Sequence, residues 1–158
     1  MNVREFLTNH GVEFEVIPHA ETYDAQHMAH ELHVSGHQVG KTVLLRADGG
    51  YRYFVAVLPA SARVDLQLVA TILGHSRVEL ATEIELAERC PDCELGALPP
   101  FGSFYGLQTL LDRSLKDHEW FVVESNTHRE SIRMKVADFI RLESPLIADF
   151  AVHPATKG

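Results

Sequence analysis

The segment KTVLLRADGGYRYFVAVL, residues 41–58, constrains the fold of this chain more than any other stretch. Two runs rich in β-branched, aromatic and other apolar residues flank Asp48-Gly49-Gly50, and glycines there permit the positive φ angles of a tight hairpin turn. Both runs are apolar at nearly every position, which is typical of strands that are covered on both faces. We therefore predict a buried central β-hairpin that ends at Pro59.

The remaining periodicities place helices and further strands around this hairpin. Helices are predicted between Asn2 and Gly11 and over residues 25–34, 65–73, 82–90 and 136–142. Asn2 is the predicted cap of the first, Asp65 opens the third, and Thr82 with Glu85 forms a capping box for the fourth. Strands are predicted over residues 12–17, 77–80, 107–111, 119–124 and 131–134, with a polar loop over residues 124–131. The fold class is therefore α+β, with a mixed, mostly antiparallel and barrel-like sheet surrounded by helices, and residues 1–158 are expected to form a single domain.

Bulk properties exclude some classes of protein. Of the 158 residues 46% are hydrophobic, an ordinary globular share, and no apolar run approaches the roughly 20 residues that span a bilayer. No signal-like segment is present, so we expect a cytoplasmic protein without a membrane partner. The net charge of −8 argues against a large nucleic-acid footprint, although it allows contact with the end of a single strand.

The two cysteines form the motif Cys90-Pro91-Asp92-Cys93. A structural zinc site needs four ligands, and a second pair of cysteines is missing. A thioredoxin-type pair lies at a strand-to-helix junction, whereas here a predicted helix precedes the motif. We therefore expect two reduced cysteines at the base of a loop, and neither a metal nor another cofactor.

Several polar residues are candidates for chemistry, and each has a structural alternative. Lys41 heads the first hairpin strand, where it either extends into solvent, which the pattern favours, or lies at the mouth of a pocket. A half-buried ammonium there would stabilise an oxyanion or bind a phosphate, and with a lowered pKa it would form a Schiff base. Asp112 either orients a substrate or caps the next turn, and His128 is either a general base or a loop residue.

The stretch DCELGALPPFG, residues 92–102, is termed the Gly/Pro loop. Pro99 and Pro100 fix two φ angles and lack N–H groups, so neither a helix interior nor a central strand suits them. Gly96 and Gly102 permit close approach of another group. These residues predict a rigid loop whose backbone is its functional part.

The segments VGKTVLL (residues 39–45), CELGALPPFG (93–102) and LLDRSL (110–115), in this order, resemble the YbaK/prolyl-tRNA synthetase-associated domain family. The resemblance covers nearly the whole chain and includes the helix MAHELHVSG and the segment LPASARVDLQLVATILG. Members of that family are freestanding or appended domains that hydrolyse mischarged aminoacyl-tRNA. The resemblance thus implies the same fold and an enzymatic activity.

The resemblance also implies a role for particular residues. Lys41 matches the essential lysine that positions the terminal adenosine and its ester, and Gly96 and Pro100 match a GxxxP motif whose backbone approaches the aminoacyl carbonyl. Rigid N–H donors at the developing oxyanion need no reorganisation during the reaction. Attack would come from water or from a thiol of the substrate, without a metal. Further residues expected at the substrate are Thr22, Tyr23, Pro99, Pro100, Phe101, Gly102, Asp112, Glu124, Ser125, Asn126 and His128.

One segment departs from the family pattern. Members that act on cysteinyl-tRNA have a Ser-Ala-Gly run where this chain has Glu124-Ser125-Asn126. A carboxylate at this position would change the amino-acid pocket, for example by meeting the substrate ammonium, and it argues against a thiol-assisted route. The sequence SNTHRES is closer to members whose loop ends in a Thr-His pair.

The predicted function is trans-editing: hydrolysis of the ester of a misacylated tRNA. The predicted partner is the 3′ acceptor end of aminoacyl-tRNA, with an aminoacyl-tRNA synthetase considered as a second partner and the oligomeric state left open. One alternative is a non-catalytic module of the same fold that binds an aminoacyl or nucleotide group. A third hypothesis is a thiol or metal function at Cys90 and Cys93.

Overall fold

The computed structural model describes residues 2–18, 36, 38–50, 52–74, 77–94 and 97–154. The strands are β1 (Phe14–Pro18), β2 (Val39–Ala47), β3 (Arg52–Pro59), β4 (Arg63–Val64), β5 (Val78–Leu80), β6 (Gln108–Asp112), β7 (Trp120–Ser125), β8 (Thr127–Lys135), β9 (Leu146–Ala148) and β10 (Ala151–Val152). The helices are α1 (Val3–Asn9), α3 (Leu66–Leu73), α4 (Glu83–Arg89), α5 (Arg113–Lys116), α6 (Val136–Glu143) and the 3₁₀ helix η1 (Gly102–Tyr105).

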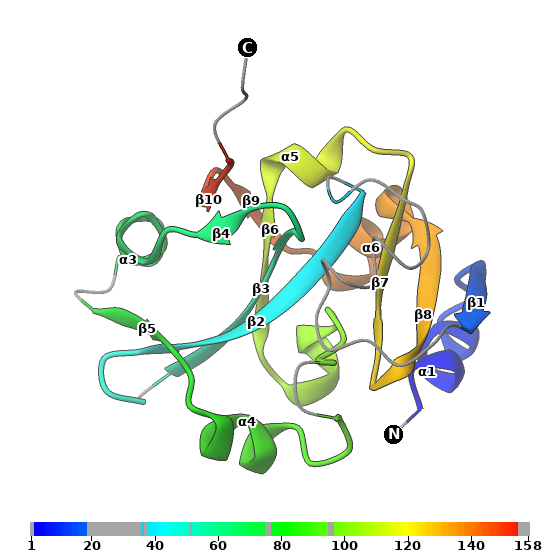
Figure 1. Ribbon diagram of the computed structural model, residues 1–158, viewed down its shortest axis with the longest axis horizontal. Helices are drawn as coiled ribbons and strands as arrows, with labels where there is room; N and C mark the ends of the chain where they lie inside the picture. Colours follow the sequence, from blue (N-terminus) through cyan, green and yellow to red (C-terminus); the bar gives the residue numbers. More distant parts are fainter. Residues whose placement is uncertain are drawn as a thin grey trace.

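One large sheet runs through the molecule in the order β1-β8-β7-β2-β3-β6-β9, and β5 adds to β2 (Figure 1). The pairs β2–β7, β3–β6 and β6–β9 are parallel, whereas β1–β8, β7–β8, β2–β3 and β2–β5 are antiparallel. The predicted α+β class with a mixed sheet is therefore confirmed. Among the described residues no pairing joins β1 to β9, so these pairings do not close the sheet into a barrel.

The predicted central hairpin is confirmed. β2 and β3 pair continuously from Gly40–Pro59 to Ala47–Arg52, and the turn residues Asp48, Gly49 and Gly50 have φ angles of 51°, 74° and 97°. Both faces are covered, as the apolar runs predicted, because separate clusters of buried side chains pack on the two sides of the hairpin. This arrangement makes β2 the rigid centre of the fold.

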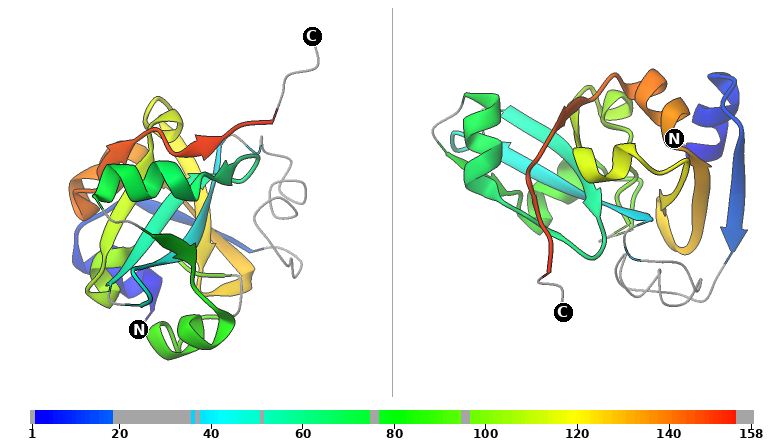
Figure 2. Two further views of the ribbon diagram at one scale, coloured as in Figure 1. Left: turned by 90° about the vertical axis from the view of Figure 1, so that its left-hand side faces the viewer. Right: turned by 90° about the horizontal axis from the view of Figure 1, so that it is seen from above.

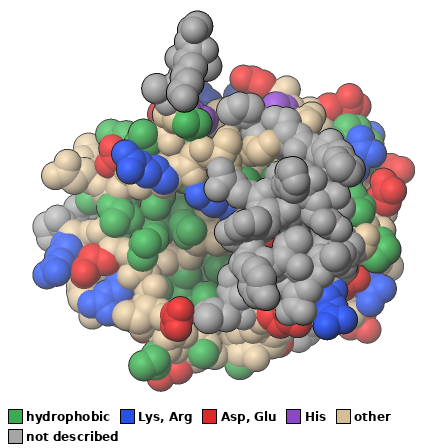
Figure 3. Space-filling view, viewed as in Figure 1, with side chains coloured by type: hydrophobic (Ala, Val, Ile, Leu, Met, Phe, Trp, Pro, Cys, Tyr) green, Lys and Arg blue, Asp and Glu red, His purple; other side chains and the backbone are tan. Residues whose placement is uncertain are grey.

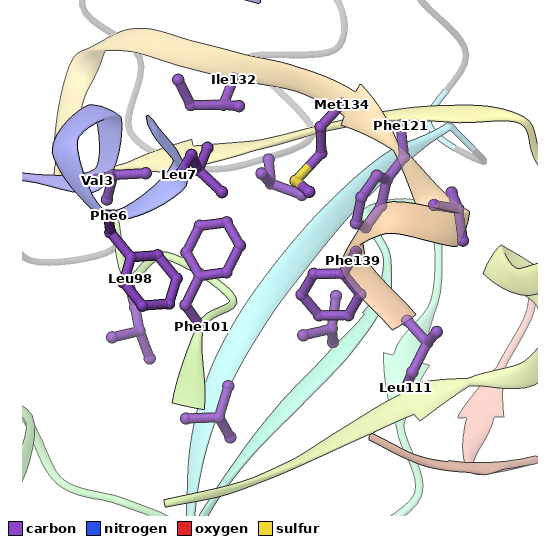
Figure 4. Close-up of a cluster of buried hydrophobic side chains, with 14 of the residues drawn as sticks. Val3, Phe6, Leu7, Leu98, Phe101, Leu111, Phe121, Ile132, Met134 and Phe139 are labelled. Carbon is purple, nitrogen blue, oxygen red and sulfur yellow. The ribbon is translucent and has the colours of Figure 1, made fainter. Parts of the chain in front are cut away.

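The first cluster contains four buried phenylalanine rings among its aliphatic side chains and is termed the aromatic cluster (Figure 4). The Phe6 ring of α1 lies 5.3 Å from the Phe101 ring, which lies 5.9 Å from that of Phe139 in α6. Phe139 in turn contacts Phe121 of β7 at 5.3 Å between ring centroids. The Gly/Pro loop, which contributes Phe101, is therefore anchored between two helices and the sheet.

The second cluster lies on the opposite face of the hairpin. It joins Leu45 and Leu58 to Val69 of α3 and to Phe150, which precedes β10. β10 pairs with β4, so the C-terminal strand lies beside β4 and α3 (Figure 2). This second layer brings the end of the described chain close to the start of β2.

The predicted helix caps are confirmed where the structure describes them. Asn2 Oδ1 accepts from Arg4 N at 2.8 Å, and Asp65 Oδ1 accepts from Gln67 N at 3.0 Å. Thr82 and Glu85 form the predicted capping box, and Glu85 also accepts hydrogen bonds from Tyr53 and Arg46 of the hairpin. These bonds, the one from Tyr53 foremost, lower the pKa of Glu85 to about 2. The predicted helix over residues 25–34 lies outside the described residues.

The predicted polar loop over residues 124–131 is wrong. β7 continues to Ser125 and β8 begins at Thr127, so Asn126 alone makes the turn, in the left-handed region at φ 66°. Asparagine tolerates this region better than most residues. Strand pairing is a property of the backbone, so the polar side chains that suggested a loop do not prevent it.

The short elements α5, β4, β9 and β10 were not predicted, since segments of two to four residues carry little periodicity. Within the described part of the chain, no helix is both long and apolar enough to cross a membrane.

Candidate active site

The site is built where β2 and β7 separate. These parallel strands pair only at Val39–Val122 and Gly40–Val123, and then diverge (Figure 1). Gly40 permits their close approach, since a Cβ there would lie 3.1 Å from the Phe121 ring. Beyond this contact β2 continues to its pairing with β5, whereas β7 turns back into β8.

We term the resulting opening the β2–β7 wedge, with Lys41 and Thr42 on one side and Glu124 and Ser125 on the other. Lys41 and Glu124 each follow directly after the Gly40–Val123 pair, so their side chains project from the same face. Glu124 is only 2% exposed, and Ser131 of β8 lies opposite it in register. The wedge therefore places an ammonium and a buried carboxylate on the same face of the two strands.

Thr42 belongs to the opposite face of β2 from Lys41, because side chains alternate along this regular strand. Thr42 Oγ1 is buried, and no hydrogen-bond partner for it is found within the described ranges. Thr42 lines a cleft of about 200 Å³ together with Leu44, Leu80, Leu98 and other apolar residues. Hydrophobic side chains gather over this region of β2 and β5 (Figure 3). Because Leu98 belongs to the Gly/Pro loop, the loop reaches the wedge from this side.

The Gly/Pro loop is fixed to the β7–β8 turn. Glu94 N donates to the Asn126 carbonyl at 2.7 Å, and Ala97 N donates to the Glu94 carbonyl at 3.0 Å. Residues 97–102, which include Pro99 and Pro100, are all buried. The N–H of Ala97 is therefore used inside the loop, and the two prolines have none.

Of the other residues expected at the site, some attach the loop to the core and the rest are not described by the structure. Phe101 packs in the aromatic cluster, and the Gly102 N–H donates to Thr109 Oγ1 at 3.1 Å, so both tie the loop to the core. The structure does not describe Gly96, Thr22, Tyr23 or the side chain of His128, although the His128 backbone belongs to β8.

Asp112 caps a helix, which was one of its two predicted roles. Its carboxylate accepts from Ser114 N at 3.2 Å at the start of α5. It also accepts from Phe150 N at 3.0 Å and from Ala151 N at 2.9 Å, which attaches the C-terminal strand to β6. A direct contact of Asp112 with substrate stays a prediction.

A second cleft, of about 460 Å³, opens on the Lys41 side of the sheet and is termed the Lys41 cleft. Its lining residues are Lys41, Ala60, Ser61, Ala62, Arg63, Val152, His153 and Pro154. Lys41 is partly exposed, so of its two predicted placements the structure shows the one at the mouth of a pocket.

Sequence reasoning missed Thr42, Arg63 and His153. The sequence did contain a signal for Thr42, since this residue directly follows Lys41 in the same predicted strand. Arg63 and His153 are 90 residues apart, and only the pairing of Val152 with Arg63 brings them together. Nothing local in the sequence indicates that pairing.

The two cysteines form a hydrogen-bonded pair at the base of the Gly/Pro loop, and both are free thiols. Cys93 Sγ lies 3.0 Å from Tyr105 Oη and accepts from Asn126 Nδ2 at 3.4 Å. The hydrogen bond from Cys90, together with those from Tyr105 and Asn126, lowers the pKa of Cys93 against the effect of burial. The same Cys90–Cys93 bond and burial raise the pKa of Cys90. In the part of the chain described, no group of three residues is arranged to hold a metal ion.

We predict that Cys93 reacts with iodoacetamide well before Cys90, because the thiolate is the nucleophile and Cys90 is only 1% exposed. Timed alkylation at neutral pH followed by peptide mass spectrometry measures both rates. Asn126→Ala removes one donor and should slow alkylation of Cys93. Equal rates, or faster labelling of Cys90, would contradict the assigned hydrogen bonds.

Solved structures share this fold. A candidate trans-editing enzyme for prolyl-tRNA synthetase superposes with a TM-score of 0.83 at 21% identity, covering 95% of this chain and 94% of that one. The crystal structure of a hypothetical protein superposes with a TM-score of 0.86 at 18% identity over 95% and 99% of the two chains. The chain therefore shares the α+β architecture of these two solved structures.

The sequence identifies the family. A profile of the aminoacyl-tRNA editing domain matches residues 19–142, and this chain belongs to that family. The multifunctional Ser/Thr-tRNA deacylase ProXp-y of Escherichia coli strain K12 is 24% identical over 147 residues, 91% of this chain and 87% of that protein. The predicted family and the predicted class of enzyme, an aminoacyl-tRNA deacylase, are thereby confirmed. The matched range contains the β2–β7 wedge but ends before β9 and β10.

Proposed function

We propose that this protein is a trans-editing deacylase that hydrolyses the ester between a wrong amino acid and the 3′ end of tRNA. The observation that carries the proposal is the β2–β7 wedge of an editing-family chain, where Lys41 and the buried Glu124 project from the same face. An aminoacyl ester carries a cationic α-ammonium next to a carbonyl whose oxygen becomes negative during hydrolysis. The Glu124 carboxylate carries the negative charge that pairs with the α-ammonium, and the Lys41 ammonium carries the positive charge that stabilises the oxyanion.

Each residue has a distinct role in this mechanism. Glu124 binds the α-ammonium of the aminoacyl group, and Lys41 positions the terminal adenosine and stabilises the oxyanion. Water adds to the carbonyl carbon, the bond from that carbon to the ribose oxygen breaks, and the ribose oxygen takes up a proton. The products are the free amino acid and uncharged tRNA, and the mechanism uses neither a metal nor another cofactor.

The Gly/Pro loop supplies further oxyanion donors in this proposal. The Ala97 N–H is bonded within the loop and Pro99 and Pro100 lack one, so the candidate among these described residues is the N–H of Leu98. The N–H of Gly96, which the GxxxP motif implies as a second donor, stays a prediction. A backbone donor held by two prolines is already oriented before the substrate arrives, which is the condition for effective electrostatic stabilisation.

Seryl and threonyl esters are the proposed substrates. The E. coli relative is named a Ser/Thr-tRNA deacylase, and a buried hydroxyl, Thr42 Oγ1, lies at the wedge without a hydrogen-bond partner in the described ranges. A site that hydrogen-bonds a substrate hydroxyl discriminates strongly against an analogue that lacks it, because its own polar group would then stay unpaired. Thr42 therefore favours Ser and Thr over Ala.

The partner in this proposal is the acceptor end of the tRNA alone. A net charge of −8 suits a site that contacts few phosphates, so binding should depend only weakly on salt. The similarity to a candidate trans-editing enzyme for prolyl-tRNA synthetase makes that synthetase a reasonable second partner to test.

The test is a deacylation panel of purified protein against tRNAs charged with Ala, Ser, Cys, Pro and Thr, with spontaneous hydrolysis in buffer as the control. We expect release of Ser and Thr at least tenfold faster than release of Ala, about the discrimination that one unpaired buried polar group provides. Release of none would contradict the proposal, and protection of the esters would instead support the non-catalytic binding module.

A further inference from the structure

The Lys41 cleft is lined by three basic side chains, although the chain as a whole has a net charge of −8. Lys41 contributes an ammonium, Arg63 a guanidinium and His153 an imidazole, and all three line the same cleft of about 460 Å³. Arg63 is exposed and pairs with no carboxylate among the residues described. The nearest carboxylate that faces His153 is that of Asp112, 3.9 Å from Nε2.

The C-terminal strand builds one wall of this cleft. Val152 pairs with Arg63 in the β10–β4 ladder, so His153 follows directly beside the arginine. The buried Asp112 carboxylate already accepts two backbone N–H groups from Phe150 and Ala151, which fixes the strand in place. The wall is therefore preorganised, and it lies outside the residues that match the editing-domain profile.

We propose that Arg63 and His153 bind the 5′-phosphate of the terminal nucleotide of the acceptor end, while its ester lies at the β2–β7 wedge. Lys41 connects the two places, because it borders the wedge and lines the cleft. Within one nucleotide the ester and the 5′-phosphate are separated by a single ribose, so a substrate held at Lys41 presents its phosphate to an adjacent cleft. Arginine is well suited to phosphate because its fork of N–H groups donates two hydrogen bonds.

This inference rests on the proposed deacylase function, since it assumes an aminoacyl nucleotide at the wedge. It adds a phosphate site formed by Arg63, inside the matched family range, and His153, outside it. A charge-assisted hydrogen bond to phosphate corresponds to about tenfold or more in affinity. The 5′-phosphate should therefore improve binding measurably.

The experiment compares two amide-linked analogues, 3′-seryl-amino-3′-deoxyadenosine with and without a 5′-phosphate, by isothermal titration calorimetry. Wild-type protein should bind the phosphorylated analogue about tenfold more tightly. Arg63→Ala should remove most of this gain and leave the affinity for the unphosphorylated analogue within about twofold, and His153→Ala should remove part of it. Circular dichroism confirms that each variant is folded.

Arg77→Ala is the matched control, because Arg77 is also exposed but pairs with Glu79 at 3.2 Å in another part of the surface. It should retain the full gain. Equal binding of both analogues, or an equal loss in the Arg77 and Arg63 variants, would overturn the phosphate site while the deacylase proposal stands. If neither analogue binds, the proposal that the β2–β7 wedge binds the aminoacyl nucleotide is contradicted. Competition by inorganic phosphate that removes the gain would assign the cleft to free phosphate instead.

Discussion

Lys41→Ala is expected to lower the single-turnover rate of deacylation at least 100-fold. Removing one preorganised donor from an oxyanion site typically costs about 10²–10³ in rate, and Lys41 is a cation at the wedge on the same face as Glu124. Because the side chain is partly exposed at a strand position, its loss should leave the sheet intact. The measurement follows release of serine from charged tRNA with enzyme in excess.

Lys116→Ala is the control for this experiment, since it removes the same charge from an exposed position at the end of α5. It should keep the wild-type rate. Lys41→Arg tests geometry, because a planar guanidinium keeps the charge but replaces a compact ammonium, and we expect it to recover only a small part of the activity. A Lys41→Ala rate within threefold of wild type would remove Lys41 from the mechanism.

The central hairpin and the helix caps could be predicted because their signals are local. Asp48-Gly49-Gly50 forms a turn because glycine permits the positive φ angles that the turn needs. Thr82 and Glu85 form a capping box that spans only four residues. These features depend on neighbours along the chain. Their prediction needs no knowledge of which strands pair.

The site depends on pairings between distant residues and could be predicted only in part. The family resemblance indicated Lys41 and Glu124, but their shared face follows from the two-residue contact of β2 with β7, 83 residues later in the sequence. The β7–β8 turn was mistaken for a loop because its polar residues pair through the backbone. His153 and Arg63 could not be found at all, because a two-residue ladder leaves no periodic pattern.

The structure also changes the interpretation of the Gly/Pro loop. The loop was predicted to be functional through its backbone, yet its second half is a structural anchor. Phe101 lies in the aromatic cluster, and the Gly102 N–H donates to Thr109 Oγ1. Thr109 Oγ1 donates to Glu143 Oε1 at 3.1 Å, and Ser103 N donates to the same carboxylate at 3.0 Å. This network ties the end of the loop to α6 and so holds the part that reaches the wedge.

Gly102→Ala is therefore expected to destabilise the protein by about 3 kcal/mol. A Cβ at Gly102 would overlap Thr109 Oγ1 and approach the Leu107 carbonyl oxygen to 2.9 Å, closer than real Cβ atoms come to backbone. The chain must shift to relieve this contact, and the Gly102–Thr109 hydrogen bond would be lost with it. Urea unfolding monitored by circular dichroism measures the free energy of unfolding.

Gly106→Ala is the control, because Gly106 has a φ of 69° but nothing lies within 4 Å of the added Cβ. It should cost only about 1 kcal/mol of backbone strain. Thr109→Ala removes the overlapping oxygen, so the double variant Gly102→Ala/Thr109→Ala should be less destabilised than the sum of the two single variants. If Gly102→Ala costs no more than Gly106→Ala, the loop is not held by close packing at Gly102, and its rigidity must come from the prolines alone.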